Sequence, residues 1–402
     1  MDPRSNPYAP GAGSPPPELA GRDELLERAS IALDRIRAGL AAKSLLLVGL
    51  RGVGKTVLLN RIRNDAEANG FATIFIEAPE TRSLPAILAG PLRAVLLKLD
   101  RLVAGGDLAK RALRTLGGFI NAMKLKFGDV EFGIDLGAEP GVADTGDLEH
   151  DLTELLATVA AAAREKKTAL VLFVDELQYV DEDQLAALIT ALHRCAQQSL
   201  PVTLVGAGLP SLVGQTGRAK SYAERLFDFP EIGPLAAEHA RQALRSPAEH
   251  HGVAYSDAAL NEILRQTQAY PYFLQEWGKH CWQAATTSPI TKKDVELATE
   301  LAIADLDASF FRVRFDRLAP SEKRYLRAMA ELGPGPHRSG DIAEQLGTKV
   351  QSVAPIRATL ISKGMVYSPA HGDTGFTVPL FDQFMRRVMP WPEQPTRPSL
   401  AE

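Results

Sequence analysis

The sequence predicts a three-layer α/β domain with a parallel sheet, followed by a helical region and a small C-terminal winged helix. Three observations lead to this prediction. First, short apolar runs typical of buried parallel strands alternate with segments of helical periodicity; these runs are 44–48, 71–77, 170–174 and 201–206. Second, four more helical segments follow one another between residues 238 and 303. Third, residues 321–378 carry three short helical segments and then a hairpin pattern.

The composition is that of a globular protein. With 402 residues, of which 45% are hydrophobic and 23% charged, the chain is long enough for two or three domains with cores of their own. The net charge of −4 requires any contact with nucleic acid to come from a local patch. Cys195 and Cys281 are the two cysteines, so there is neither a disulfide framework nor a cysteine metal cluster. No apolar window reaches 18 residues and no signal pattern begins the chain, so we expect a cytoplasmic protein without membrane contact.

The chain divides by composition into five parts. Residues 1–17 contain six prolines with interspersed glycine and serine, which predicts a disordered arm that cannot build a core. Order begins near Leu19 with a helix that runs to about Leu40. The predicted parts after the arm are an α/β core at 18–234, with a helical and hairpin insertion at 81–150, a helical part at 235–305 that a family resemblance (below) implies is a lid, a winged helix at 306–392 and a tail at 393–402.

A glycine-rich run between the first strand and the next helix has the pattern of a phosphate-binding P-loop. The run is Gly-Leu-Arg-Gly-Val-Gly-Lys-Thr, residues 49–56. Its glycines let backbone N–H groups and the helix N-terminus converge on phosphates, while a lysine brings positive charge and a threonine offers an oxygen to Mg²⁺. The residues expected to bind nucleotide are Gly49, Gly52, Val53, Gly54, Lys55, Thr56 and Val57, and Thr56 is also expected to bind the metal.

A second run ends a buried strand with two adjacent carboxylates, Asp175 and Glu176. Unpaired charge is costly in a core, so such a strand end must open onto a site. We expect Asp175 to bind the Mg²⁺ shell and Glu176 to act as general base on the attacking water. The alternative is that both residues are ordinary turn formers, and their pairing with the P-loop favours the catalytic interpretation.

The insertion leaves two interpretations open. Helical segments at 84–103 and 108–123 precede a predicted hairpin at 124–132 and a loop at 137–146. The favoured interpretation is a solvated helical face that covers the sheet. The other is a surface for a partner or for DNA, formed by Lys110, Arg111, Arg114, Lys124 and Lys126.

Together, Gly21-Arg22 before the first helix, the P-loop and the Asp-Glu strand end resemble the AAA+ superfamily, nearest its origin-recognition-like and STAND-like ATPases. The resemblance implies ATP as the nucleotide, with Gly21 and Arg22 in the segment that covers the adenine. No Asn-Lys-x-Asp guanine-reading motif is present. Ala269-Tyr270-Pro271 resembles the Gly-x-Pro lid motif, which implies that Pro271 contacts the nucleotide; this chain departs from the motif at Ala269. The alternative is that Tyr270 and Pro271 only mark the junction between a loop and a helix.

The same resemblance implies two catalytic additions. The first is an arginine that reaches the γ-phosphate from the same or a neighbouring subunit. An arginine from a neighbouring subunit would make the protein a homo-oligomer. Arg225 has the matching place in the sequence and Arg218 is its competitor. The favoured alternative is that Arg225 forms only a surface salt bridge. The second is a polar sensor after the fourth strand, but residues 206–210, Gly-Ala-Gly-Leu-Pro, offer no such side chain. We therefore expect hydrolysis to be slow or to be assisted by Gln178.

The C-terminal pattern is similar to the winged helix-turn-helix of origin-recognition ATPases. Its predicted helices are 321–332, 339–346 and 350–363, and its wing is a hairpin whose turn contains His371. Residues 320–390 contain nine Lys or Arg and six Asp or Glu, a basic bias opposite to that of the whole chain. If this region binds double-stranded DNA, the third helix would present Lys349, Gln351, Ser352 and Arg357. The alternative is a winged helix that contacts a protein partner.

These features predict an ATPase that converts ATP to ADP and phosphate and acts as a molecular switch. ATP and Mg²⁺ would close the lid on the core, and hydrolysis would reposition the winged helix. The first hypothesis couples this switch to DNA. A second makes it a STAND-like signalling ATPase whose winged helix contacts proteins, and a third keeps nucleotide binding without turnover.

Overall fold

The computed structural model describes residues 1–11, 13–78, 82–101, 107–124, 141–370 and 372–391. Two compact units make up the chain: a larger unit of residues 5–254 and 263–279, and a smaller unit of residues 1–4, 255–262 and 280–402. Helices α10 (Asp257–Thr267) and α11 (Pro271–Ala284) contribute residues to both. The units therefore differ from the predicted division at residues 234 and 305.

The larger unit is built on a five-stranded sheet. Its strands are β1 (Ser44–Val48), β2 (Ala72–Glu77), β3 (Leu170–Asp175), β4 (Val202–Gly208) and β5 (Phe227–Asp228). They pair in the order β2-β3-β4-β1-β5, and every neighbouring pair is parallel. The central strands β1, β3 and β4 are buried along their whole length, because they carry apolar residues on both faces. The α/β prediction is confirmed, and all carboxyl ends of the strands meet at one edge.

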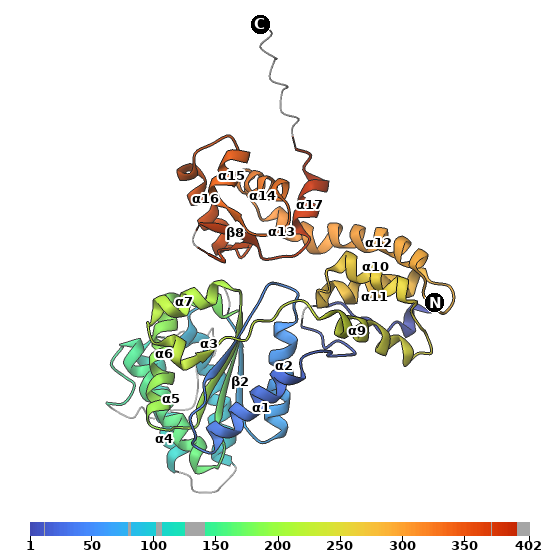
Figure 1. Ribbon diagram of the computed structural model, residues 1–402. Helices are drawn as coiled ribbons and strands as arrows, with labels where there is room; N and C mark the ends of the chain where they lie inside the picture. Colours follow the sequence, from blue (N-terminus) through green and yellow to red (C-terminus); the bar gives the residue numbers. More distant parts are fainter. Residues whose placement is uncertain (12, 79–81, 102–106, 125–140, 371, 392–402) are drawn as a thin grey trace. The chain divides into compact units, whose positions relative to one another are not determined.

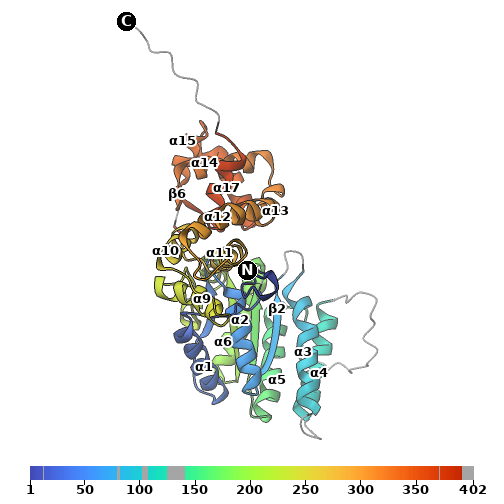
Figure 2. The same ribbon diagram turned by 90° about the vertical axis from the view of Figure 1, so that its right-hand side faces the viewer.

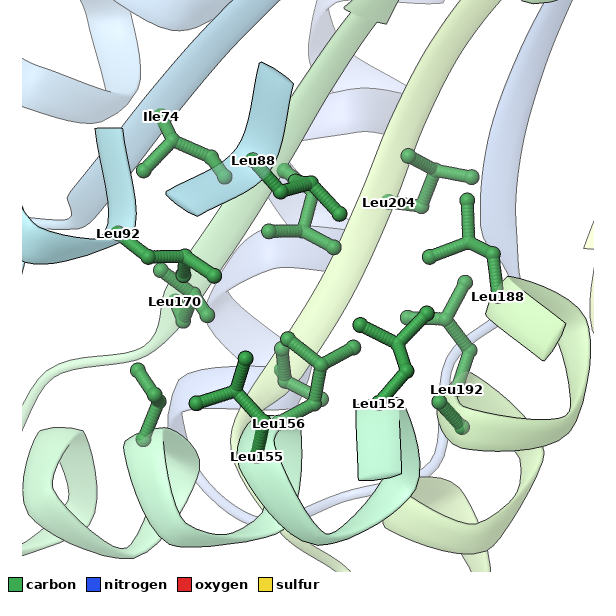
Figure 3. Packing of buried hydrophobic residues seen from close by; sticks show 14 of the residues in the cluster. Ile74, Leu88, Leu92, Leu152, Leu155, Leu156, Leu170, Leu188, Leu192 and Leu204 are labelled. Carbon is green, nitrogen blue, oxygen red and sulfur yellow. The ribbon is translucent and has the colours of Figure 1, made fainter. Parts of the chain in front are cut away.

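Helices cover both faces of this sheet (Figure 1). One face is covered by α1 (Asp23–Arg37) and α2 (Lys55–Ala68), whose apolar side chains pack on alternate residues of β1, β3 and β4. The other face packs against α3 (Leu84–Arg101), α4 (Asp107–Ala122), α5 (Leu148–Glu165) and α6 (Glu182–Gln197). Figure 3 shows this second core, in which leucines of α3, α5 and α6 meet those of β3 and β4. The result is the predicted three-layer arrangement.

The predicted insertion belongs to this second layer. Helices α3 and α4 lie side by side next to edge strand β2, as Figure 2 shows, and α4 packs on α5. Ala112 and Leu116 of α4 are buried, whereas Lys110, Arg111 and Arg114 are exposed. This burial pattern agrees with a solvated helical face that covers the core. The predicted hairpin at 124–132, which includes Lys126, lies outside the described residues except for Lys124.

Short elements complete the larger unit. After β3 come a 3₁₀ turn, η2 (Leu177–Tyr179), and helix α6; after β4 come α7 (Ser211–Ala219) and α8 (Ala223–Leu226), and after β5 comes α9 (Ala237–Glu249). Helix α5 begins at an N-cap, because the Asp147 carboxylate accepts a hydrogen bond from the His150 N–H at 2.9 Å. No helix of the described residues is both long and apolar enough to span a membrane.

The prediction of a disordered arm at residues 1–17 is wrong where the structure describes it. Tyr8 is only 4% exposed; its hydroxyl donates to the Leu244 carbonyl and its ring lies against Gly278. The Asn6 side-chain amide donates to the Lys279 carbonyl at 3.0 Å. Composition alone missed this, because one aromatic side chain and one amide are enough to anchor a proline-rich segment to a surface formed elsewhere.

The smaller unit contains helices and a small antiparallel sheet, as predicted. Its elements after α11 are α12 (Lys292–Leu306), a π-helical turn η3 (Asp307–Phe311), α13 (Arg312–Asp316), α14 (Pro320–Leu332), β6 (His337–Arg338), α15 (Ser339–Gln345), α16 (Val350–Ser362), β7 (Val366–Tyr367), β8 (Asp373–Phe376) and α17 (Phe381–Val388); η1 (Pro3–Ser5) begins the chain. The strands pair antiparallel in the order β6-β8-β7. The rings of Phe311, Phe381 and Phe384 are buried against one another.

Candidate functional site

The phosphate loop leaves the carboxyl end of β1 and leads into α2. The N–H of Gly49 donates to the Gly208 carbonyl at 3.2 Å. A Cβ added to Gly49 would lie 2.1 Å from the Ile232 carbonyl oxygen, so a side chain does not fit there. Gly54, the residue before α2, has φ +89°, a left-handed conformation that suits glycine. The loop therefore needs glycine at these two positions, and its backbone brings the N-terminus of α2 to the edge of the sheet.

Lys55 lies inside this loop. The side chain is 7% exposed, and its ammonium donates to the carbonyls of Gly49 at 3.0 Å and Leu50 at 2.9 Å. Burial lowers the pKa of Lys55 to about 8, although the carboxylates of Glu176 and Asp175 oppose that shift. A buried ammonium whose charge is only partly compensated is suited to an anionic ligand such as a polyphosphate.

Thr56 and Asp175 meet directly across the site. The Thr56 hydroxyl donates to Asp175 Oδ2 at 2.6 Å, so the loop after β1 touches the end of β3. Asp175 is 3% exposed, and burial raises the pKa of its carboxyl above the ordinary value. A hydroxyl and a buried carboxylate side by side form the kind of oxygen donor set that Mg²⁺ prefers, and a cation would relieve the cost of burying the carboxylate charge. The residues present fit a magnesium ion.

Glu176 lies next to this pair, in a left-handed conformation with φ +51°. Arg51 of the phosphate loop approaches Glu176 Oε1 at 3.5 Å and donates to the Tyr179 hydroxyl at 2.7 Å. The side-chain amide of Gln178 donates to the other carboxylate oxygen, Oε2. Sequence reasoning missed Arg51 and Tyr179, because an arginine between loop glycines and a tyrosine after a strand carry no chemical signature of their own.

Comparison with known proteins identifies this part of the chain. Residues 18–205 match the family model described as AAA ATPase domain. These residues form an AAA ATPase domain. Residues 308–385 match a second model, described as a domain of unknown function, DUF8462. No curated protein matches the chain.

Solved structures match the chain at low sequence identity. A Walker-type ATPase of Pyrococcus abyssi is 16% identical, with 92% of this chain and 96% of that chain covered and a TM-score of 0.56. The Aeropyrum pernix Orc1 protein in complex with DNA is 17% identical, with coverages of 92% and 94% and a TM-score of 0.45. The Thermotoga maritima RuvB Holliday junction branch migration motor is 17% identical, with coverages of 88% and 91% and a TM-score of 0.44. The first of these likenesses shows the fold alone, and the other two are too distant to support any assignment.

The other residues expected to contact the nucleotide lie on two further segments. Gly21 has φ +67° and lies against the His239 ring of α9, while the Arg22 guanidinium donates to the Gly233 carbonyl at 2.6 Å. Pro271 begins α11, and the next residue, Tyr272, donates its N–H to the Gly52 carbonyl of the phosphate loop at 3.1 Å. The start of α11 therefore lies on the phosphate loop.

The two candidates for the catalytic arginine lie on different helices that follow β4. Arg225 belongs to α8, which directly precedes β5, and Phe227 of β5 pairs with Ser44 at the amino end of β1. Since the phosphate loop follows the carboxyl end of β1, Arg225 lies near the opposite, amino ends of the strands. Arg218 of α7 forms an exposed ion pair with Glu182 at 3.2 Å.

The four residues expected to bind DNA differ in their exposure and in their contacts. Lys349, Gln351 and Ser352 are exposed at the start of α16. Arg357 is only half-exposed. Its guanidinium donates to the Thr374 hydroxyl at 2.7 Å, the Ser368 hydroxyl at 2.7 Å and the Asp373 carbonyl at 2.8 Å. The expectation that Arg357 contacts DNA is corrected, because its charge already holds the β7–β8 hairpin. Wing residue 371 lies outside the described residues.

Proposed function

We propose that the AAA ATPase domain is a magnesium-dependent switch that hydrolyses ATP and is coupled to a C-terminal winged helix that binds double-stranded DNA. The observation that carries the hydrolytic part is the meeting of Thr56 with Asp175 beside the buried Lys55. A hydroxyl, a carboxylate and an ammonium group thus lie together at the carboxyl ends of the parallel strands, where ligands bind on such a fold.

Each residue has a proposed role. Lys55 binds the β- and γ-phosphates, and the loop N–H groups of Gly52 to Thr56 hold the phosphate oxygens. Thr56 and Asp175 would hold Mg²⁺, which would neutralise charge on the phosphates. Glu176 accepts a proton from the attacking water. Arg225, at the far edge of its own sheet, is proposed to act only on the site of a neighbouring copy, and Arg218 remains the alternative.

Support for the DNA-binding part comes from the start of α16. Lys349 is exposed next to Gln351 and Ser352, so a cation and two hydrogen-bonding side chains share the first turn of a helix. Such a turn presents both its side chains and its N–H groups to phosphates and base edges. The basic bias of residues 320–390 works in the same direction.

Phosphate release measured on the full chain tests the hydrolytic part. We expect magnesium-dependent release by the unaltered protein, loss of nucleotide binding in Lys55→Ala, and a fall of about 100-fold in kcat with retained binding in Glu176→Gln. Glu165→Gln, an exposed glutamate at the end of α5, is the matched control and should keep full activity. Release that persists at the same rate in Glu176→Gln contradicts the assignment of the base.

Anisotropy of a labelled DNA duplex at two salt concentrations tests the DNA-binding part. Binding should weaken as salt rises, and Lys349→Ala should reduce both the affinity and its dependence on salt. Lys166→Ala, a change at the C-terminus of α5, is the control. Absence of duplex binding at low salt, together with normal ATP hydrolysis, would favour a signalling ATPase whose smaller unit contacts proteins.

A further inference from the structure

The carboxyl end of β4 contains glycine where a polar side chain was expected, and Gln178 fills the space. A Cβ added to Gly208 would lie 2.8 Å from the Gln178 Oε1 atom and 2.9 Å from the Leu212 Cδ2 atom. Contacts this short do not occur between real atoms without a shift. Gly208 therefore leaves the space that the Gln178 side chain of η2 occupies at the end of β4.

Both ends of the Gln178 amide are engaged. Its oxygen accepts a hydrogen bond from the Leu209 N–H at 3.0 Å, and its nitrogen donates to Oε2 of Glu176. The main chain of Gln178 is held as well, because its carbonyl accepts from the Gln215 side-chain amide of α7 at 3.1 Å. One side chain thus connects the carboxylate after β3 to the backbone after β4 and to α7.

An amide is the group that this bridge requires. It must accept from a backbone N–H on one side and donate to a carboxylate on the other, and a neutral amide does both at once. An ionised carboxylate could accept but not donate, and a thioether of the same length could do neither well. The other oxygen of Glu176 faces Arg51 at 3.5 Å, so Gln178 and Arg51 define the orientation of the carboxylate from two sides.

We propose that Gln178 is the positioning residue for Glu176 in ATP hydrolysis and takes the place of the polar side chain that the end of β4 lacks. This inference rests on the proposed role of Glu176 as general base. Gln178 does not contact phosphate or water in this scheme; it acts through the carboxylate, by holding it where it accepts the proton of the attacking water. The same bridge connects the state of that carboxylate to α7.

Two substitutions in the full chain test this role. Gln178→Glu keeps the length and the acceptor for the Leu209 N–H but cannot donate to Glu176, and Gln178→Met removes both hydrogen bonds. For each we expect kcat to fall at least about tenfold, while the affinity for a non-hydrolysable ATP analogue stays within about threefold of the unaltered protein. The control is Gln198→Glu, an exposed glutamine just after α6, which should change neither quantity.

A double-mutant cycle separates positioning from a purely structural role. If Gln178 acts through Glu176, then Gln178→Glu costs nothing more once Glu176→Gln is present, and melting temperatures of the variants stay close to one another. The inference alone is overturned if Gln178→Glu hydrolyses within twofold of the unaltered rate while Glu176→Gln is inactive, or if the two losses simply multiply. Unchanged hydrolysis in Glu176→Gln would instead overturn the proposed function and this inference with it.

Discussion

The carboxyl edge of the sheet in the larger unit and the start of α16 in the smaller unit use their polar residues in opposite ways. At the sheet edge the functional side chains face one another: Thr56 binds Asp175, and Arg51 and Gln178 both hold Glu176. At the start of α16, Lys349 is exposed, and the charge of Arg357 is turned inward to hold the hairpin. The difference is that the proposed catalytic site is recognised by contacts among its own residues, whereas the proposed DNA-binding surface is recognised by the side chains that it leaves exposed.

The largest expected effect is at the phosphate loop, where Gly49→Ala tests how closely the site is built. The new methyl group would overlap the Ile232 carbonyl, so we expect the free energy of unfolding to fall by about 3 kcal/mol and nucleotide affinity to fall more than tenfold. The control is Gly217→Ala in α7, which has open space around it and should stabilise by about 0.5 kcal/mol. Denaturant unfolding and nucleotide titration measure both, and equal behaviour of the two variants would contradict the tight packing at Gly49.

In the smaller unit, Arg357→Ala should cost stability and leave the nucleotide site intact. Three hydrogen bonds to the hairpin are lost, which predicts a destabilisation of about 2 kcal/mol with unchanged ATP affinity. Lys349→Ala, an exposed change on the same helix, should stay within about 0.5 kcal/mol of the unaltered protein. Calorimetry of the full chain compares them. A neutral Arg357→Ala would show that the arginine is free for a ligand after all, and the contrast between the two regions would be weaker.

A smaller effect, of opposite sign, is expected just before α11. Ala269 has φ +56°, a left-handed conformation that costs an alanine energy and a glycine almost none. Ala269→Gly should therefore stabilise the chain by up to about 1 kcal/mol, in spite of the greater freedom of glycine in the unfolded state. Ala284→Gly, at the C-terminal end of α11, is expected to destabilise. Thermal unfolding distinguishes them, and destabilisation by Ala269→Gly would show that the strain is relieved by neighbouring contacts.

The smallest expected effect is that of Arg225→Ala on nucleotide binding by a single chain. β1 alone separates Ser44 from the phosphate loop by roughly 13 Å, and Arg225 lies beyond its amino end. We expect ATP affinity at high dilution to change less than twofold. Titration with a fluorescent nucleotide measures this, with Arg51→Ala as a comparison that should alter the site. A large loss in Arg225→Ala at high dilution would place this arginine at its own site.

Much of the fold was predictable because its signals are local. The strand at 44–48 agrees residue for residue with β1, and the four helical segments between 238 and 303 agree with α9 to α12 within a few residues. The exceptions depend on distant contacts. Tyr8 and Arg357 are held by hydrogen-bond partners elsewhere in the sequence. Helix α17, which the sequence analysis missed, packs into a buried aromatic cluster.

The sequence by itself predicted the chemistry that we propose, because phosphate binding needs glycine, lysine and threonine at fixed spacing and the proposed metal site needs a carboxylate at the end of a strand. It also determined the order of the layers, because hydrophobic periodicity decides which segments become strands and helices. Only the tertiary structure decided which polar residues act together. Gln178 reaches both Glu176 and the backbone after β4 because parallel strands bring their carboxyl ends to one edge, and Arg225 is kept from its own phosphate loop by the direction of the strand that follows it.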